Sequence, residues 1–379
     1  MDFRLTEEQQ LLRRTVREFA DAEIRPHVRE WDEAQHFPVE LMPKLARLGL
    51  LGIQWPEEYG GAGMSALDYC ICVEEIARVD PGVALSVAAH NGLSSAHLAM
   101  FGSDEQKRTF LTPLSRGEKI GAWGLTEATS GSDAAGLRTT ATKSGGAWVL
   151  NGSKAFTTHG RVGDVLVAMA VTDRSAGPKG ISAFIIERGT PGMTPGKKED
   201  KLGMRASETS EVVFDNCRVA ADRMLGVEGQ GFVNAMQVLD AGRIGIAALS
   251  VGLAQGAYEA GLAYAHERKA FGRTIDRFQA IQWKLADTAT RIEAARLLTY
   301  RAACLKDRGE RLTLESAMAK LYASEIAVQA ADDCVQIHGG YGFVKDYPAE
   351  KFFRDVKLTT IGEGTSEIQR LVIARHLLS

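Results

Sequence analysis

The chain has 379 residues, of which 45% are hydrophobic and 25% charged, and its formal net charge is −3. This length suggests two or three domains and is enough to bury sizeable cores without disulfides or metals. The composition lacks the basic excess typical of nucleic-acid binders, so we expect no nucleic-acid partner.

The five cysteines are odd in number and widely scattered, which argues against a disulfide framework and favours a reducing, cytoplasmic location. Cys70 and Cys72 form the only close pair, with no His or Cys cluster beside them, so we predict no metal site. The N-terminus does not resemble a signal or transit peptide. No run approaches 18 apolar residues, so we expect no membrane span.

The pattern predicts an α+β chain in three parts. Residues 1–118 are expected to form an all-α domain, starting with a helix after Thr6 that Pro26 ends or kinks. Further helical periodicity covers 66–78, 83–101 and 105–114.

Residues 119–230 are rich in short runs of Val, Ile, Thr and Phe, which predicts a middle β domain, a barrel or a sandwich. The expected strands are 164–172, 180–188 and 211–220. We also expect a hairpin over 147–159, with Asn151 and Gly152 as its two-residue turn.

Residues 231–379 return to helical spacing and predict a C-terminal helical bundle. Five glycines interrupt one long helical stretch, and each costs about 1 kcal/mol relative to alanine. Close packing between helices explains most of them. They are Gly242, Gly245, Gly252, Gly256 and Gly261.

Four polar or glycine-rich segments could bind a ligand, although each also has an ordinary structural interpretation. The loop 124–133 could hydrogen-bond a planar ring or a phosphate, or be a surface turn. Phe156 with the hydroxyls that follow it could cover a flat cofactor, or simply suit a strand. The bases of 268–273 could bind a diphosphate, or end a helix. The glycines of 339–342 could allow close ligand approach, or end a helix.

The last candidate is Glu363, which lies between two glycines just before a helix that starts near Thr365. A carboxylate without bulk beside it can approach a substrate carbon, and desolvation would raise its pKa toward neutrality, as a general base requires. The alternative is a helix-capping acid, although Thr365 and Glu367 could cap the helix without it.

Each motif is weak alone, but their order and spacing resemble the acyl-CoA dehydrogenase family over nearly the whole chain, of short-, medium- or short-branched-chain type. The resemblance rests on six segments: Gly124-Leu-Thr-Glu with Gly131-Ser-Asp, Asn151-Gly-Ser-Lys, Lys201-Leu-Gly-Met-Arg, Arg268-x-x-Phe-Gly, Gln336-x-His-Gly-Gly, and Glu363-Gly-Thr-Ser-Glu-Ile-Gln-Arg. The three-part layout also fits that family.

The resemblance implies FAD as cofactor, and it assigns contacts residue by residue. Thr158 matches the hydroxyl that bonds the flavin N5 edge. Residues from the 268–279 and 336–340 segments match positions that reach the FAD of a neighbouring subunit, which implies a homotetramer built as a dimer of dimers. The matching FAD residues are Trp123, Leu125, Thr126, Gly131, Ser132, Phe156, Thr158, Arg268, Phe271, Gln279, Gln336, Ile337, Gly339, Gly340, Thr365 and Glu367.

The resemblance also implies the chemistry. Ser132, Asp240, Arg243 and Gly364 match acyl-CoA contacts, and Glu363 matches the catalytic base. The base removes the α-proton of an acyl-CoA thioester while FAD N5 takes the β-hydride. The product is a trans-2-enoyl-CoA, and the electrons pass to an electron-transfer flavoprotein.

Three positions depart from the family pattern. Phe156-Thr157-Thr158 stands where Trp-Ile-Thr is usual, Gly362 replaces a common aromatic residue, and Ala128 replaces a common proline. Gly362 should leave space near the substrate α-carbon. The acyl-tail pocket has Val87, Ala88, His90 and Asn91 as candidates, with a structural role as the alternative for His90.

Three other functions compete with the dehydrogenase. An acyl-CoA oxidase of the same fold would use O₂, but such oxidases are often longer. A nitroalkane-oxidase-like enzyme would use an aspartate as base, where this chain has Glu363. A non-catalytic scaffold protein would not need Glu363 or the flavin motifs.

Overall fold

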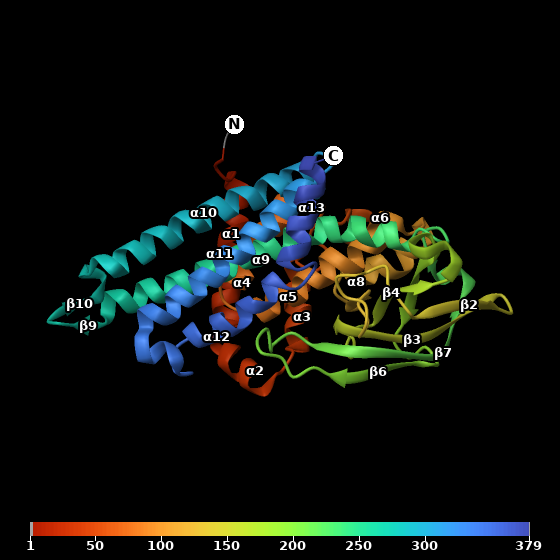
Figure 1. The fold of residues 1–379 in the computed structure, drawn as a ribbon, viewed down its shortest axis with the longest axis horizontal. Helices are drawn as coiled ribbons and strands as arrows, with labels where there is room; N and C mark the ends of the chain where they lie inside the picture. The colour runs from red at the N-terminus through yellow and green to blue at the C-terminus, as the bar shows by residue number, and fades with distance from the viewer. Residues whose placement is uncertain (1–2, 379) are drawn as a thin grey trace.

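The structure is a computed structural model that describes residues 3–378, and it has the three expected parts (Figure 1). The N-terminal part is helical. Its first helix begins with a capping box, in which the Thr6 side chain accepts from Gln9 N and the Gln9 side chain accepts from Thr6 N. The helices are α1 Glu7–Glu23, α2 Val28–Ala34, α3 Met42–Arg47, α4 Ala66–Ala77, α5 Pro81–Ala89, α6 Ala96–Phe101, α7 Asp104–Gln106 and α8 Thr112–Ser115.

The middle part is a mixed sheet of eight strands, ordered β6-β7-β3-β2-β4-β5-β8, with β1 parallel to β4. Alternate residues of β4 enter two different cores, because successive side chains of a strand point to opposite faces. The strands are β1 Gly121–Gly124, β2 Thr140–Ser144, β3 Ala147–Thr158, β4 Val165–Val171, β5 Ile181–Glu187, β6 Met193–Lys198, β7 Thr209–Ala220 and β8 Met224–Leu225.

The predicted hairpin turn at Asn151 and Gly152 is wrong. Both residues lie inside the continuous strand β3, where the pairing with β7 shifts register between Leu150 and Gly152. The turn instead connects β2 to β3 through Gly145 and Gly146, which have φ values of 55° and 75°. A type I′ turn needs two successive positive φ angles, so the glycine pair suits it better than Asn-Gly at a bulge.

The C-terminal part is a set of long helices centred on α9, which packs against α4, α5, α10 and α11. A two-stranded hairpin extends from the end of α9, at the opposite end of the molecule from the sheet (Figure 1). The elements are α9 Gly231–Glu267, β9 Lys269–Ala270, β10 Arg273–Thr274, α10 Gln279–Asp307, α11 Thr313–His338, α12 Ala349–Asp355 and α13 Ser366–Leu378.

The glycines of α9 allow close helix packing, as predicted. A Cβ placed at Gly252 would lie 2.2 Å from the carbonyl oxygen of Glu74 on α4, and one at Gly256 would lie 2.2 Å from that of Arg78. Within residues 3–378, α9 alone is long and apolar enough to cross a membrane, by length and composition, and 78% of its most apolar window is buried inside the structure.

Gly252→Ala should lower the free energy of unfolding by about 1–3 kcal/mol, because the new Cβ collides with rigid backbone. Gly261→Ala in the same helix is the control, since the atoms nearest to its Cβ would be Ile337 Cδ1 at 3.3 Å and Cys334 Cα at 3.8 Å, with no backbone collision. Thermal unfolding followed by circular dichroism would test this. Equal midpoints for the two variants would contradict the packing argument.

Candidate functional site

Glu363 occupies a turn between the 3₁₀ helix Val356–Thr360 and α13. It has a φ of 53°, and Gly364 after it has a φ of 93°. A left-handed conformation costs a non-glycine residue roughly 1–2 kcal/mol, so the surrounding contacts must hold it. The turn directs a carboxylate toward α9 without placing a side chain on the residue that follows.

Hydrogen bonds to carbonyl oxygens hold this turn. Lys320 Nζ on α11 donates to Gly364 O at 2.7 Å. Gln369 Nε2 on α13 donates to Glu363 O at 3.2 Å and to Gly364 O at 2.9 Å. The Thr365 hydroxyl accepts from Ile368 N at 3.3 Å, which caps α13 without using the Glu363 side chain.

The carboxylate of Glu363 lies against α9 at Gly242. Its Oε2 atom is buried and has no hydrogen-bond partner among residues 3–378, although the residue as a whole keeps partial exposure. A Cβ at Gly242 would come within 2.3 Å of that oxygen, so only glycine leaves room for it. Burial raises the pKa of Glu363 to about 7, against the opposing influence of Lys320 and Arg243.

The predicted substrate contacts on α9 lie in the turn of helix beside this carboxylate. Arg243 is buried and donates from Nη1 to Asp240 Oδ1 at 2.5 Å, and the Thr313 hydroxyl donates to Asp240 Oδ2 at 2.6 Å. Ser132, the other predicted contact, lies on an exposed loop of the middle part. The structure therefore joins Asp240, Arg243, Glu363 and Gly364 in one place.

The Tyr69 ring and a π-helical turn border the space near Glu363. Tyr69 on α4 is buried, and its hydroxyl lies 2.5 Å from where a Cβ at Gly245 would be and 3.3 Å from one at Gly92. Gly92 belongs to the π-helical turn His90–Ser95, a type of helix irregularity that is frequent at functional sites. Burial raises the pKa of Tyr69 well above its ordinary value, so this hydroxyl is neutral.

His90 has a structural role, which was the alternative to its lining the acyl-tail pocket. Its Nδ1 accepts from Gly121 N at 3.1 Å, and its Nε2 faces Leu114 O at 3.1 Å. Burial lowers the pKa of His90 to about 4, so the ring stays neutral. His90 thus fastens the π-helical turn to strand β1.

The residues predicted to contact flavin in the middle part lie on β1, on β3 and on the loop between β1 and β2. Trp123 Nε1 donates to His97 Nδ1 at 3.0 Å, which fixes the indole on β1. Phe156 has a φ of 52° and is 65% exposed, so its ring stands on the surface. Leu125, Thr126, Gly131 and Thr158 complete this group.

A buried ion pair supports that loop. Lys154 Nζ on β3 lies 2.6 Å from Glu127 Oε1, and the same carboxylate accepts from Arg138 N and Thr139 N. Desolvation lowers the pKa of Lys154 to about 8, and Glu127 partly offsets it. These four groups fix the loop that carries Leu125, Thr126 and Gly131.

A second group of predicted flavin contacts lies far from the first. Arg268, Phe271 and Gln279 surround the β9–β10 hairpin, whereas Trp123 and Phe156 lie on the sheet at the other end of the molecule (Figure 1). The Phe271 ring is 95% exposed. Gln336, Gly339 and Gly340 are exposed at the end of α11, and Ile337 there is buried.

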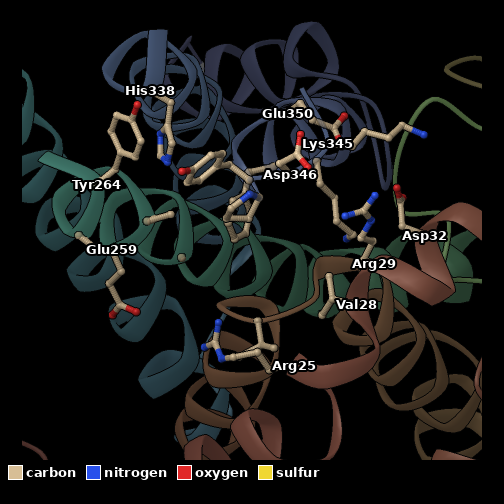
Figure 2. Close-up of a pocket in the computed structure, with 18 of the residues that line it drawn as sticks. Arg25, Val28, Arg29, Asp32, Glu259, Tyr264, His338, Lys345, Asp346 and Glu350 are labelled. Atoms are coloured by element: carbon tan, nitrogen blue, oxygen red, sulfur yellow. The ribbon is translucent and has the colours of Figure 1, made fainter. Parts of the chain in front are cut away.

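A cavity of about 550 Å³ lies away from Glu363, between α2, the end of α9 and α12 (Figure 2). Tyr264 and His338 stack along its wall with ring centroids 4.2 Å apart. Charged side chains in its lining are paired: Arg78 with Glu259, and Asp32 with Arg354 outside the lining. A second cavity of about 400 Å³ includes Thr365 and Glu367 in its lining.

Three residues that the sequence reasoning missed belong to this site: Tyr69, Lys320 and Gln369. Lys320 could have been found, because it falls on the same helical stripe as Ala317, Ala323 and Ala327, where a charge is out of place. Tyr69 carries no comparable sequence signal, and Gln369 falls in the motif that begins at Glu363, which gives it no separate role. Among the residues described, no group of three or more His, Cys, Asp or Glu is placed to hold a metal ion.

The structure thus combines a helical domain, a mixed sheet and a helical bundle, and it places the Glu363 carboxylate against Gly242 of α9. Three domain models of one family match the chain in order. They are "Acyl-CoA dehydrogenase, N-terminal domain" over residues 6–118, "Acyl-CoA dehydrogenase, middle domain" over 122–217, and "Acyl-CoA dehydrogenase, C-terminal domain" over 229–378. The chain belongs to the acyl-CoA dehydrogenase family and is an oxidoreductase of that family.

Relatives match over the full length. The chain is 49% identical over 374 residues to the short-chain specific acyl-CoA dehydrogenase of Clostridium acetobutylicum, covering 99% of each. It superposes on butyryl-CoA dehydrogenase from Megasphaera elsdenii with a TM-score of 0.98, 44% identity and full coverage of both chains. It also superposes on a chain from a structural study of the electron transferring flavoprotein of Acidaminococcus fermentans, with a TM-score of 0.99, 47% identity and full coverage of both chains.

Acyl-CoA dehydrogenases are FAD-dependent, and the residues of this chain fit the cofactor. The Thr157 hydroxyl on β3 is buried and finds no hydrogen-bond partner within residues 3–378. A Cβ at Gly131, Gly339 or Gly340 would meet no atom within 4 Å, so a ligand can approach the backbone at those points.

Proposed function

We propose that this protein dehydrogenates a short-chain acyl-CoA thioester between its α and β carbons, with Glu363 as the base. The observation that carries the proposal is the buried Glu363 carboxylate, which lies against a glycine and has an oxygen with no partner among the described residues. Its pKa of about 7 lets it accept a proton near neutral pH.

In the proposed reaction, Glu363 contributes both its carboxylate and its backbone N–H. The Glu363 carboxylate takes the proton from the α-carbon and keeps it. The backbone N–H of Glu363 donates to the thioester carbonyl, where negative charge develops, and such a donor contributes several kcal/mol to the transition state. FAD, when bound, accepts the hydride from the β-carbon, so that one proton and one hydride leave and a trans-2-enoyl-CoA forms.

Glu363→Gln should reduce the rate of flavin reduction by acyl-CoA by about 10²–10⁴-fold, since the amide cannot accept the proton. FAD content and acyl-CoA affinity should stay near wild type because size and most hydrogen bonding are kept. Anaerobic mixing with butyryl-CoA, followed by flavin absorbance, measures this. The control is Glu310→Gln, on an exposed loop. A mutant flavin that bleaches at the wild-type rate would show that another acid is the base.

The acyl group is short and can carry bulk at its α-carbon. Tyr69 fills the space between α4 and the α9 glycines, which supports a short chain. The nearest atom to a Cβ at Gly362 would be Leu358 O at 3.5 Å, which is ordinary contact. The missing side chain at this position therefore leaves room beside the base.

Gly362→Tyr should lower activity on a branched acyl-CoA about tenfold more than on butyryl-CoA, because the ring fills the space beside the α-carbon. Values of kcat/KM for isobutyryl-CoA and butyryl-CoA with an artificial acceptor give the ratio, and the straight-chain substrate serves as the internal control. Equal losses on both substrates would remove the steric argument.

The proposed assembly is a homotetramer, built as a dimer of dimers. The flavin residues of the sheet and those around the β9–β10 hairpin lie at opposite ends of one chain, so one FAD contacts both groups when it lies between two chains (Figure 1). The exposed Phe271 and Phe156 rings support such an interface, because large aromatic rings are rarely left in water without a partner.

Arg268→Ala should weaken FAD binding about 10- to 100-fold, since a charge-assisted hydrogen bond to the diphosphate, about 1.5–3 kcal/mol, is lost. FAD retention through gel filtration measures this, and Arg174→Ala on the exposed turn after β4 is the control. A monomeric holoenzyme, or an Arg268 variant that keeps its FAD as well as the control, would contradict the assembly.

The proposed electron acceptor is an electron-transfer flavoprotein in the cytoplasm. The strong likeness to a chain from the study of the Acidaminococcus fermentans electron transferring flavoprotein supports it. Turnover should require that protein or an artificial acceptor. Rapid turnover with O₂ alone and stoichiometric peroxide would instead identify an oxidase.

A further inference from the structure

The base lies in a backbone conformation that needs support. Glu363 and Gly364 are successive residues with positive φ, at 53° and 93°. The carboxylate position follows directly from this backbone, because the left-handed turn directs the side chain toward Gly242. Groups that fix the two carbonyl oxygens therefore fix the base.

Lys320 is an unusual donor to this turn. It is fully buried on α11, and burial lowers its pKa to about 8. Two other buried lysines lie in ion pairs: Lys154 lies 2.6 Å from Glu127, and Lys351 lies 2.5 Å from Asp355. Within residues 3–378, no carboxylate lies within 4.0 Å of Lys320 Nζ, which instead donates to Gly364 O. A buried charge is costly unless it is compensated, so its position beside the base calls for a functional reason.

Gln369 acts on the same turn from the other side. It is fully buried, and its Nε2 atom donates to the carbonyl oxygens of both Glu363 and Gly364. A Cβ at Gly364 would lie 2.7 Å from that nitrogen, so the amide lies directly against the turn. Its Oε1 atom has no partner among residues 3–378, so its bonds to the described residues go to this turn alone.

We propose that Lys320 and Gln369 are positioning residues that clamp the Glu363–Gly364 turn and so aim the base at the substrate α-carbon. The inference rests on the proposed function of Glu363. It assigns to α11 and α13 a role in the reaction beyond packing.

Charged and titratable groups reach Glu363 from four helices. Lys320 on α11 and Arg243 on α9 favour the ionised form of Glu363. Asp240 accepts a hydrogen bond from Arg243 and partly neutralises its charge. Tyr69 on α4 stays neutral, and Glu367 on α13 acts on Lys320. Removal of the Lys320 charge leaves Arg243 as the cation that opposes burial, so the proton leaves Glu363 at a higher pH.

The test is anaerobic flavin reduction of the holoenzyme by butyryl-CoA across neutral pH. The wild-type rate should rise with pH through a midpoint near 7. Lys320→Met should lower the maximum rate about 10- to 100-fold and raise the midpoint by about one pH unit. Gln369→Met should lower the maximum rate without moving the midpoint, since it removes donors but no charge.

The matched control is Lys306→Met. Lys306 on α10 donates to a neutral acceptor, Gln54 Oε1 at 2.6 Å, away from the turn. This variant should keep both the rate and the midpoint. A Lys320→Met profile equal to wild type, or to that of Lys306→Met, would overturn the clamp.

Two further readouts keep the inference separate from the proposed function. If butyryl-CoA and other acyl-CoAs fail to reduce the wild-type flavin, the proposed function fails and the clamp fails with it. If the wild type is reduced but Lys320→Met loses FAD, Lys320→Arg and Gln369→Met decide the matter. The clamp then requires that Lys320→Arg keep the wild-type pH midpoint and that Gln369→Met reduce the flavin more slowly. A wild-type rate in Gln369→Met would overturn the clamp.

Discussion

The site depends on one constraint: the Glu363 carboxylate is desolvated, and the backbone of its turn, not an ion pair, holds it in position. Glu363 accepts a left-handed φ, lies against Gly242 and keeps an oxygen without a partner among the described residues. The left-handed φ and the unpartnered oxygen each cost free energy, and burial of the carboxylate raises its pKa and makes it a stronger base. The surrounding helices supply the stability that offsets this cost.

Helix α9 links Glu363, the proposed base, to the rest of the molecule. Its glycines bring α4 and the Glu363 turn close to its axis, its Asp240–Arg243 pair lies beside the base, and its far end carries the hairpin with Phe271. In the proposed homotetramer, the length of α9 would also set the distance between the two groups of proposed flavin contacts. Core packing and the proposed cofactor site would then share one element.

The sequence was sufficient for the three-part fold and the family, because helical period, strand composition and motif order can be read along the chain. Its assignment of Glu363 as the base stays a prediction. The sequence failed at Asn151 and Gly152, where a bulge inside a long strand resembles a turn. It also missed Lys320 and Gln369, whose role appears only when α11 and α13 meet the Glu363 turn. The Lys320 contact joins residues 44 positions apart, which share no pattern in a single sequence. Gln369 lies only 6 positions from Glu363, and its contact depends on how the turn folds back on α13.

The most direct test of this account is the titration of Glu363 itself, from the infrared difference spectrum of the wild-type holoenzyme minus Glu363→Gln. We predict a protonated carboxyl band that disappears as the pH rises through about 7, because burial holds the proton on Glu363 until then. A carboxyl group already ionised at the pH of an ordinary exposed glutamate, about 4.3, would contradict the account.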